Sequence, residues 1–348
     1  MEEIIDRIEP IDQTYVENAR NRQQKLTKPA GSLGRLEEVA NSITGITRNN
    51  RPSLKKKRIY IVAADHGVAD EGVSAYPKQV TFQMVLNFLQ GGAAINVLGR
   101  HGSIDLRVVD AGVAHPLPQH EILIDRKIAP GSRNFTQVAA MTYQQAEQSI
   151  AIGIELVQQA KIEGIELLGV GEMGIGNSTS ASAITSILTS KDPSEVTGSG
   201  TGITNDQLQH KISLIRKAIM TNKPNPKDSI DILHKIGGLE IGVITGMALG
   251  AAAEKIPFLC DGFISTSAVA LAVALSTKVR DYIFISHYST EPGQRALVEY
   301  LNIDPLLDLK MRLGEATGVA VAMHLVEAST KLLNEMATFD QAGVSEKI

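Results

Sequence analysis

Short, continuous apolar segments recur along the chain, and each ends in a polar or glycine-containing turn. They cover residues 58–65, 106–110, 165–171, 256–261 and 282–286. Continuous hydrophobicity, rather than alternation, is typical of strands in a parallel sheet, because helices cover both faces of such a sheet. We therefore predict that these segments are parallel β-strands.

Between these segments the apolar residues recur with the spacing of a helix. The expected helices cover residues 80–98, 142–161, 179–188, 205–220, 241–254, 265–278 and 318–336, with another beginning near residue 33. Alternating strands and helices predict an α/β fold, a three-layer Rossmann-like parallel sheet with flanking helices. The polar and glycine residues follow the expected strands, and the carboxyl ends of strands are where open α/β sheets bind ligands.

The two ends of the chain are expected to form a smaller helical domain. This domain would combine residues 1–50 with residues 318–348, and residues 51–317 would form the α/β catalytic domain. The opening residues are polar, with a solvent-facing helix expected at 20–25, whereas the C-terminal segment has the pattern of one long amphipathic helix.

Composition narrows the class of protein. The 348 residues carry a net charge of −4, which argues against a general nucleic-acid binder. The single cysteine, Cys260, excludes an internal disulfide and a multi-cysteine metal cluster, and we expect it to be a core residue. The acidic, interrupted start does not resemble a targeting peptide, and no apolar run approaches the roughly 18 residues of a membrane helix. We expect a cytoplasmic protein that binds neither nucleic acid nor membranes.

The densest chemical signal lies in residues 169–185, where Gly171, Gly174 and Gly176 separate an expected strand from a helix. Glycines let backbone N–H groups approach an anion closely, and a helix N-terminus adds partial positive charge. The spacing GxxGxG is neither the dinucleotide fingerprint nor a Walker loop, so a tight turn without a ligand is an equally good interpretation. Glu172 favours a functional site, because a carboxylate beside an anion site is costly without a purpose.

Two further segments carry candidate groups. A Gly/Thr-rich turn at 197–205 precedes a helix with Lys211, which could hold a phosphate; for the isolated turn, a flexible surface loop is the better interpretation. Glu315 lies between two glycines before an apolar helix, either as an N-terminal charge or as a buried general base. The pair Asp65–His66 lacks further metal-ligand spacing nearby, and no GxSxG elbow occurs, so neither a metal site nor a serine hydrolase is expected.

Several segments, taken together, resemble the nicotinate-nucleotide–dimethylbenzimidazole phosphoribosyltransferase family. They are residues 28–38, 64–81, 169–179, 222–228, 259–268, 286–293 and 311–318, which follow in order through most of the chain. The resemblance implies transfer of the phosphoribosyl group of nicotinate mononucleotide to 5,6-dimethylbenzimidazole, giving α-ribazole 5′-phosphate for the cobalamin lower ligand. It also implies a homodimer with active sites near the subunit interface, and a reaction that needs neither a metal nor a cofactor.

The same resemblance implies roles for individual residues. Glu315 matches the general base, and Glu172 matches a second active-site carboxylate. The implied substrate-binding residues are Tyr76, Gln83, Met84, Met173, Gly174, Ile175, Gly176, Asn177, Gly200, Gly202, Lys211, Ser289 and Leu313. Of these, Lys211 and the two glycine loops match the phosphate-binding region, whereas Tyr76, Gln83 and Met84 fall in the segment that contacts the base. Tyr76 occupies a place where smaller residues also occur, so the base preference is the least determined part.

Two other functions stay open at this stage. One is a transferase of the same fold with a different acceptor, such as adenine or a phenol. The other is a nucleotide-binding regulator or dehydrogenase on a doubly wound sheet, against which the missing GxGxxG fingerprint argues.

Overall fold

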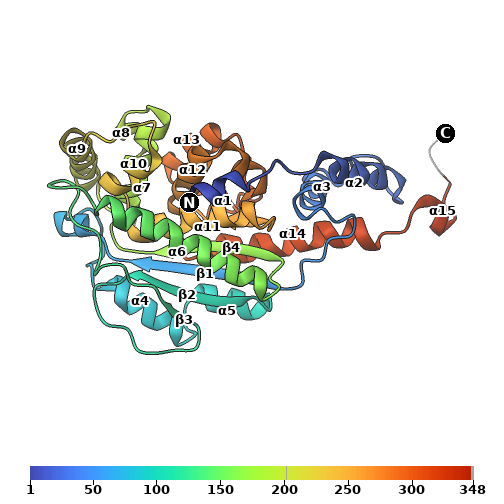
Figure 1. Cartoon of the computed structure of the whole chain (residues 1–348), viewed down its shortest axis with the longest axis horizontal. Coiled ribbons are helices and arrows are strands. Elements are labelled where there is room, and N and C mark those ends of the chain that lie inside the picture. Colours follow the sequence, from blue (N-terminus) through green and yellow to red (C-terminus); the bar gives the residue numbers. More distant parts are fainter. Residues whose placement is uncertain (201, 346–348) are drawn as a thin grey trace.

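A computed structural model describes residues 1–200 and 202–345 and has a six-stranded parallel sheet at its centre (Figure 1). The strands are β1 (Lys57–Ala64), β2 (Asp105–Gly112), β3 (Leu123–Asp125), β4 (Leu167–Met173), β5 (Phe258–Cys260) and β6 (Ile283–Ile285). Their order in the sheet is β3-β2-β1-β4-β5-β6, the Rossmann order, and every pairing is parallel. The predicted fold class is therefore confirmed.

Helices precede, connect and follow the strands. The N-terminal helices are α1 (Glu2–Asp6), α2 (Gln13–Lys25) and α3 (Arg35–Thr47). Those between strands are η1 (Gly67–Glu71), α4 (Val80–Leu89), α5 (Ala94–His101), α6 (Tyr143–Ile162), α7 (Asn177–Thr189), α8 (Pro193–Val196), α9 (Asn205–Asn222), α10 (Ser229–Ile236), α11 (Leu239–Ala253), α12 (Phe263–Leu275) and η2 (Thr277–Tyr282). After β6 come α13 (Pro292–Leu301), α14 (Thr317–Glu335) and α15 (Phe339–Ala342). Within the described residues, no helix has both the length and the apolar character needed to cross a bilayer.

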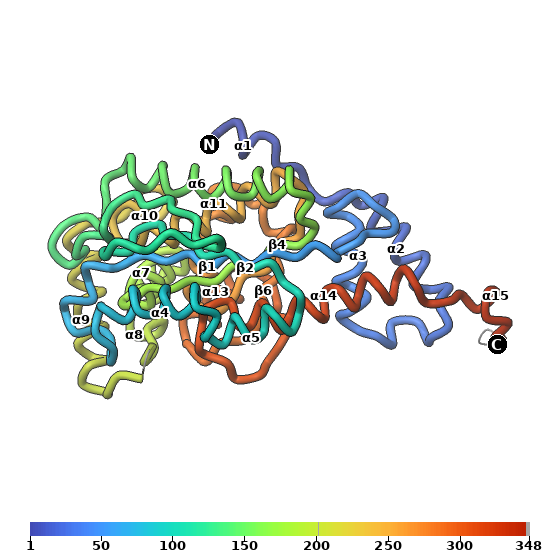
Figure 2. Tube along the Cα trace, turned by 90° about the horizontal axis from the view of Figure 1, so that it is seen from below, coloured from blue at the N-terminus to red at the C-terminus, as the bar shows by residue number. Residues whose placement is uncertain are grey.

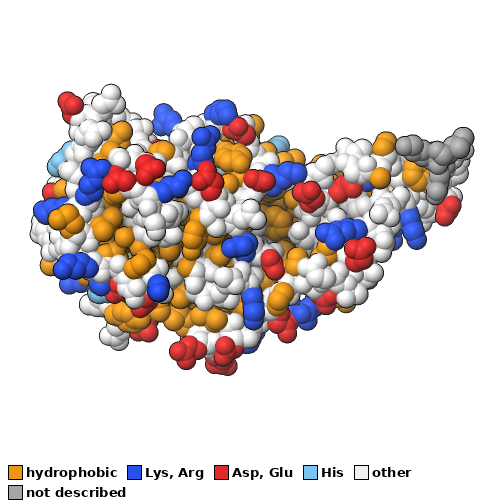
Figure 3. Space-filling model, turned by 90° about the horizontal axis from the view of Figure 1, so that it is seen from above, with side chains coloured by type: hydrophobic (Ala, Val, Ile, Leu, Met, Phe, Trp, Pro, Cys, Tyr) orange, Lys and Arg blue, Asp and Glu red, His pale blue; other side chains and the backbone are white. Residues whose placement is uncertain are grey.

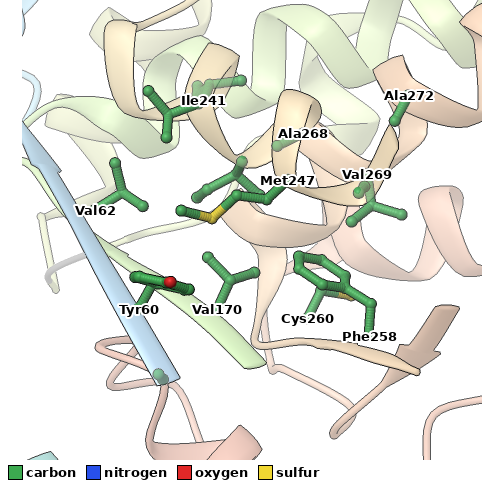
Figure 4. Close-up of a cluster of buried hydrophobic side chains, with 14 of the residues drawn as sticks. Tyr60, Val62, Val170, Ile241, Met247, Phe258, Cys260, Ala268, Val269 and Ala272 are labelled. Carbon is green, nitrogen blue, oxygen red and sulfur yellow. The ribbon is translucent and has the colours of Figure 1, made fainter. Parts of the chain in front are cut away.

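The sheet is covered on both faces, which explains the continuous apolar strands. Helices α11 and α12, with α6 behind α11, cover one face, whereas α4, α5 and α14 cover the other (Figure 1). Adjacent residues of β4 show this directly, because successive side chains of a strand point to opposite faces. Val170 packs in a cluster with Met247 of α11 (Figure 4), whereas a Cβ on Gly169 would collide with Val319 of α14.

The core lies mainly between the sheet and α11, whose residues are all buried. The cluster there is aliphatic, with Val62, Val170, Ile241 and Met247 beside Phe258 (Figure 4). Glycines bring α11 against α6: a Cβ on Gly246 would overlap the carbonyl oxygen of Ile150. Cys260 is buried in this core, as predicted, and burial raises the pKa of its thiol to about 12.

Helices α2, α3 and the end of α14 extend beyond the sheet as an arm (Figures 1 and 2). Ala19, Ala40 and Leu333 form a small buried cluster of their own within it. The segment after α1 instead lies against the α/β body, where the Tyr282 hydroxyl donates to the Glu9 carbonyl at 2.8 Å. The proposed division at residues 50 and 318 stays a prediction, and residues 346–348 of the expected helical domain lie outside the described part.

Several element boundaries differ from the expectations. The helix expected at 80–98 is two helices, because Gly91 adopts φ 77° and the chain turns there. Strand β3, with three residues at the sheet edge, and helices α8, α10 and α13 were not predicted. Their short apolar stretches are too brief to show a period.

The surface carries both signs of charge. In the view from above, acidic and basic side chains are interspersed over the visible face (Figure 3). This face presents no broad basic field.

Candidate active site

The strand order reverses between β1 and β4, and open α/β sheets bind ligands at that point, beyond the carboxyl ends of the strands. Pairing of Val62 with Glu172 and of Ala63 with Met173 brings both strand ends to the same level. The sequence pattern places Glu172 in the glycine loop, whereas in the structure it is the penultimate residue of β4. The strand therefore fixes the position of Glu172 at the point where the strand order reverses.

Glu172 is a buried acid among other acids. Its side chain accepts a hydrogen bond from the Asn177 amide, and the residue is only 8% exposed. Burial raises its pKa to about 8, opposed by the Asn177 bond and reinforced by the carboxylates of Glu240, Asp261 and Glu315. At pH 7 the Glu172 carboxyl is therefore mainly protonated, until a positive charge comes near it.

Glycines place the Glu315 segment directly against β4. A Cβ on Gly171 would collide with the backbone of Ala316, and a Cβ on Gly314 would lie 2.8 Å from Glu172 Oε1. Glu315 and Ala316 both adopt left-handed backbone, with φ of 58° and 61°, before α14 begins. Such conformations are costly for residues with a Cβ, and they persist where the surroundings enforce them.

Glu315 does not cap α14. Asp261, at the end of β5, takes that role: its Oδ1 accepts from the amides of Gly318 at 2.9 Å and Val319 at 3.3 Å. Within the described residues no hydrogen bond reaches the Glu315 carboxylate. Burial raises the pKa of Glu315 to about 7, and the Asp261 carboxylate adds to that rise. This pKa lies close to the working pH of a general base.

The loop Gly174–Gly176 leads into the N-terminus of α7. Gly176 is the N-cap residue, with φ 98°, and no side chain caps the first turn. Thr81 of α4 accepts a hydrogen bond from the Ile175 amide at 3.0 Å, which holds the loop in place. In the first turn of α7 the amides of Asn177 and Thr179 donate to the carbonyls of Gly174 and Gly176, at 3.1 and 3.0 Å. The Ser178 amide has no partner among the described residues, so it is available to an anion.

The second glycine turn meets the first around Lys211. Lys211 is 1% exposed, and its Nζ donates to Ser178 Oγ at 2.9 Å. Glu291 accepts from the Gly200 amide at 3.0 Å. Burial lowers the pKa of Lys211 to about 8, while the Glu291 carboxylate opposes that decrease. The structure thus joins the two loops that were ambiguous alone; Thr201 lies outside the described part, and Gly202 is exposed.

The remaining predicted substrate contacts lie further out. Tyr76 and Leu313 are 56% and 58% exposed, Gln83 is exposed and Met84 half-buried on α4. Ser289 is half-buried and, with Glu291, lines a cavity of about 910 Å³ beside α13. That cavity does not include Glu172 or Glu315, so we place the chemistry at the carboxylates, where strand ends and perturbed pKa values coincide.

Several site residues were not singled out from the sequence. Asp261 and His287 follow β5 and β6, and their positions after apolar runs were a usable signal. His287 Nδ1 lies 3.6 Å from Asp261 Oδ1. Glu240, at the start of α11, had no signal, because only the folded chain brings it to His66 at 2.6 Å. In residues 1–200 and 202–345, no three His, Cys, Asp or Glu side chains are arranged to hold a metal ion.

The chain is similar to known proteins over nearly its whole length. A family model described as "Phosphoribosyltransferase" matches residues 8–344. A nicotinate-nucleotide–dimethylbenzimidazole phosphoribosyltransferase of Chloroflexus aurantiacus is 51% identical over 344 residues, 99% of this chain and 98% of that protein. One of the same name from Geobacter sp. strain M21 is 49% identical over 345 residues, 99% of each chain. The crystal structure of CobT from Thermus thermophilus superposes with a TM-score of 0.92 at 41% identity, covering 96% of this chain and 100% of that one.

Proposed function

The chain belongs to the nicotinate-nucleotide–dimethylbenzimidazole phosphoribosyltransferase family, and on that premise we propose the reaction that its site performs. The enzyme moves the 5-phosphoribosyl group of nicotinate mononucleotide to 5,6-dimethylbenzimidazole, giving α-ribazole 5′-phosphate and nicotinate for the cobalamin lower ligand. The observation that carries this proposal is the pair of buried carboxyls, Glu172 and Glu315, beside an uncapped helix N-terminus and a buried lysine.

The phosphate of the nucleotide binds at the start of α7. The Ser178 amide supplies a donor, and Lys211 supplies a positive charge that water screens little because the side chain is buried. Burial lowers the pKa of Lys211 to about 8, and a phosphate dianion beside it restores the protonated form. A single phosphate is held, so there is no pyrophosphate charge to neutralise.

The leaving group departs as neutral pyridine nitrogen from a cationic pyridinium, so it needs no general acid. The positive charge moves from the pyridinium toward the ribose ring as the bond to C1′ breaks. Glu172 faces this charge: the cationic substrate favours its ionised form and lowers the pKa that burial had raised to about 8. The carboxylate then stabilises the positive ribose in the transition state.

The acceptor attacks C1′ through one ring nitrogen while Glu315 takes the proton from the other. With a pKa raised to about 7, Glu315 is both substantially ionised at neutral pH and basic enough to accept that proton. Attack on the face opposite the nicotinate inverts C1′, which converts a β-nucleotide into an α-nucleotide. Tyr76, Gln83, Met84 and Leu313 would contact the flat base near Glu315; the half-buried and exposed positions of these residues leave room for it.

We further propose that the protein is a homodimer in the cytoplasm. The arm presents an apolar cleft of about 240 Å³ between α3 and α14, lined in part by Leu33, Leu36 and Leu325. Apolar clefts rimmed by polar residues are typical of protein contacts. The one cysteine is buried and unpaired, which fits a reducing compartment.

One assay tests the reaction. The purified chain is mixed with nicotinate mononucleotide and 5,6-dimethylbenzimidazole, and α-ribazole 5′-phosphate is identified by mass and retention time. Adenine and a phenol are offered in parallel as acceptors. Turnover of dimethylbenzimidazole no faster than that of adenine would reject the stated acceptor, and no product with any acceptor would reject the transferase.

A further inference from the structure

His66 is a buried histidine that the proposed chemistry does not use. It follows β1 and is fully buried, beneath the loop Gly174–Gly176. A Cβ on Gly174 would lie 3.3 Å from His66 Cδ2, and one on Gly176 would lie 3.4 Å from His66 Cβ. The His66 side chain thus packs against this loop, together with the backbone of Ala64 and Ala69.

A third glycine, at the start of α11, leaves room for the other edge of the ring. A Cβ on Gly238 would overlap His66 Cε1. The ring is therefore enclosed by backbone from two loops and cannot turn without moving one of them. Because interiors are close-packed, the position of the ring and the position of the loop are coupled.

Two side chains lie within hydrogen-bond distance of the His66 ring. Nε2 lies 2.6 Å from the Glu240 carboxylate, and Nδ1 lies 3.3 Å from Ser180 Oγ. The Ser180 hydroxyl also lies 3.2 Å from the Gly237 carbonyl. The ring is therefore held at both nitrogens, by Glu240 of α11 on one side and by Ser180 of α7 on the other.

We propose that the hydrogen-bonded pair His66–Glu240 is a positioning device that holds the loop Gly174–Gly176 in its phosphate-binding shape. The inference rests on the proposed function, because it assigns that loop to the phosphate of the nucleotide. His66 acts through the backbone of Gly174 and Gly176, and Ser180 ties the same ring to α7. Its loss would move the loop and the start of α7, whereas Glu315 lies on another segment, before α14.

A purely structural role accounts less well for the pair. Burying two polar side chains costs their hydration, and a well-packed apolar pair of similar volume is often as stable. The pair also leaves Glu240 Oε2 buried without a hydrogen-bond partner in the described residues. Such an arrangement is explained by a fixed geometry that it maintains, here the start of α7.

The test compares substrates that differ only in the phosphate. His66→Gln is assayed with nicotinate mononucleotide and with nicotinate riboside, and ribose 5-phosphate binding is measured by calorimetry. His234→Gln is the matched control, since His234 on α10 also makes a hydrogen bond, to the Met141 carbonyl, and lies outside the site. Thermal unfolding is recorded for each variant.

We expect His66→Gln to weaken ribose 5-phosphate binding and to reduce the preference for nucleotide over riboside by about tenfold, the scale of one hydrogen bond to a charged group. Turnover at saturating nucleotide should stay within about threefold of the wild-type value, because Glu172 and Glu315 are both retained. Unchanged ribose 5-phosphate binding would overturn the inference, as would an equal loss for both donors or the same loss in His234→Gln.

Two milder variants decide the matter if His66→Gln does not fold. Ser180→Ala removes the hydroxyl beside Nδ1, and Glu240→Gln replaces the carboxylate beside Nε2. Each should lower the nucleotide preference by about threefold. No change in either would overturn the inference. Wild-type protein that binds ribose 5-phosphate but forms no product would reject the proposed reaction and leave the loop assignment standing.

Discussion

Helices α7 and α14 begin at the same edge of the sheet, yet their N-termini are built differently. The first turn of α7 follows Gly176 and has no side-chain cap. The first turn of α14 follows Ala316, and its amides donate to the buried carboxylate of Asp261. One helix N-terminus is open to an anion from outside, whereas the other already holds an anion from the chain.

We therefore expect the two helix ends to have different roles. An open N-terminus with a buried lysine is suited to hold the phosphate of the substrate. A closed N-terminus is suited to fix geometry, and here it fixes Glu315 just before the helix, with a carboxylate neighbour that raises its pKa. Changes at α14 should therefore affect turnover and its pH dependence, and changes at α7 should affect the binding of the nucleotide.

The largest effect is expected at α14. Replacing Glu315 with Gln removes the base but keeps the volume and should lower kcat by about 10²-fold, the lower range for general-base catalysis. Glu335→Gln, at the exposed far end of the same helix, is the control and should leave kcat unchanged. Initial rates at saturating substrates measure this; wild-type turnover in Glu315→Gln would remove Glu315 from the mechanism.

A smaller effect of another kind is expected at α7. Lys211→Met removes the buried charge beside Ser178 and should raise KM for nicotinate mononucleotide by about 10-fold to 10²-fold, with little change in KM for the acceptor. Lys217→Met, on the exposed side of α9, is the matched control. If KM for the nucleotide did not change, the phosphate would have to bind elsewhere and the two helix ends would not differ in function.

The smallest effect concerns pH. At saturating nucleotide, kcat/KM for the acceptor should decline about tenfold per pH unit below about pH 7, as Glu315 becomes protonated. Asp261→Asn keeps an oxygen for the amides of α14 but removes the negative charge that raises the pKa of Glu315. The acidic limb should therefore move to lower pH. If the variant kept its thermal stability and its rate still declined at the wild-type pH, Asp261 would not influence the pKa of Glu315.

The sequence by itself determined the fold class. The apolar strands were recognisable because both faces of the sheet are covered, and continuous apolar segments leave no doubt about burial. It also singled out Glu172, Glu315 and the loop Gly174–Gly176 as candidates, from the glycines around them, and the family resemblance suggested their roles. What it left ambiguous was local: an isolated glycine turn looks the same whether it binds an anion or only turns the chain.

Only the tertiary structure decided which groups meet. Lys211 reaches Ser178, Asp261 reaches the amides of α14, and Glu240 reaches His66, and none of these pairs lies close in sequence. Their contacts depend on strand order and helix packing, which combine segments from different crossovers, so spacing along the chain carries no record of them. That packing makes Asp261 the cap of α14 and leaves the Glu315 carboxylate without a hydrogen bond within the described residues. It also raises the pKa values of Glu172 and Glu315, because burial is a property of the folded chain.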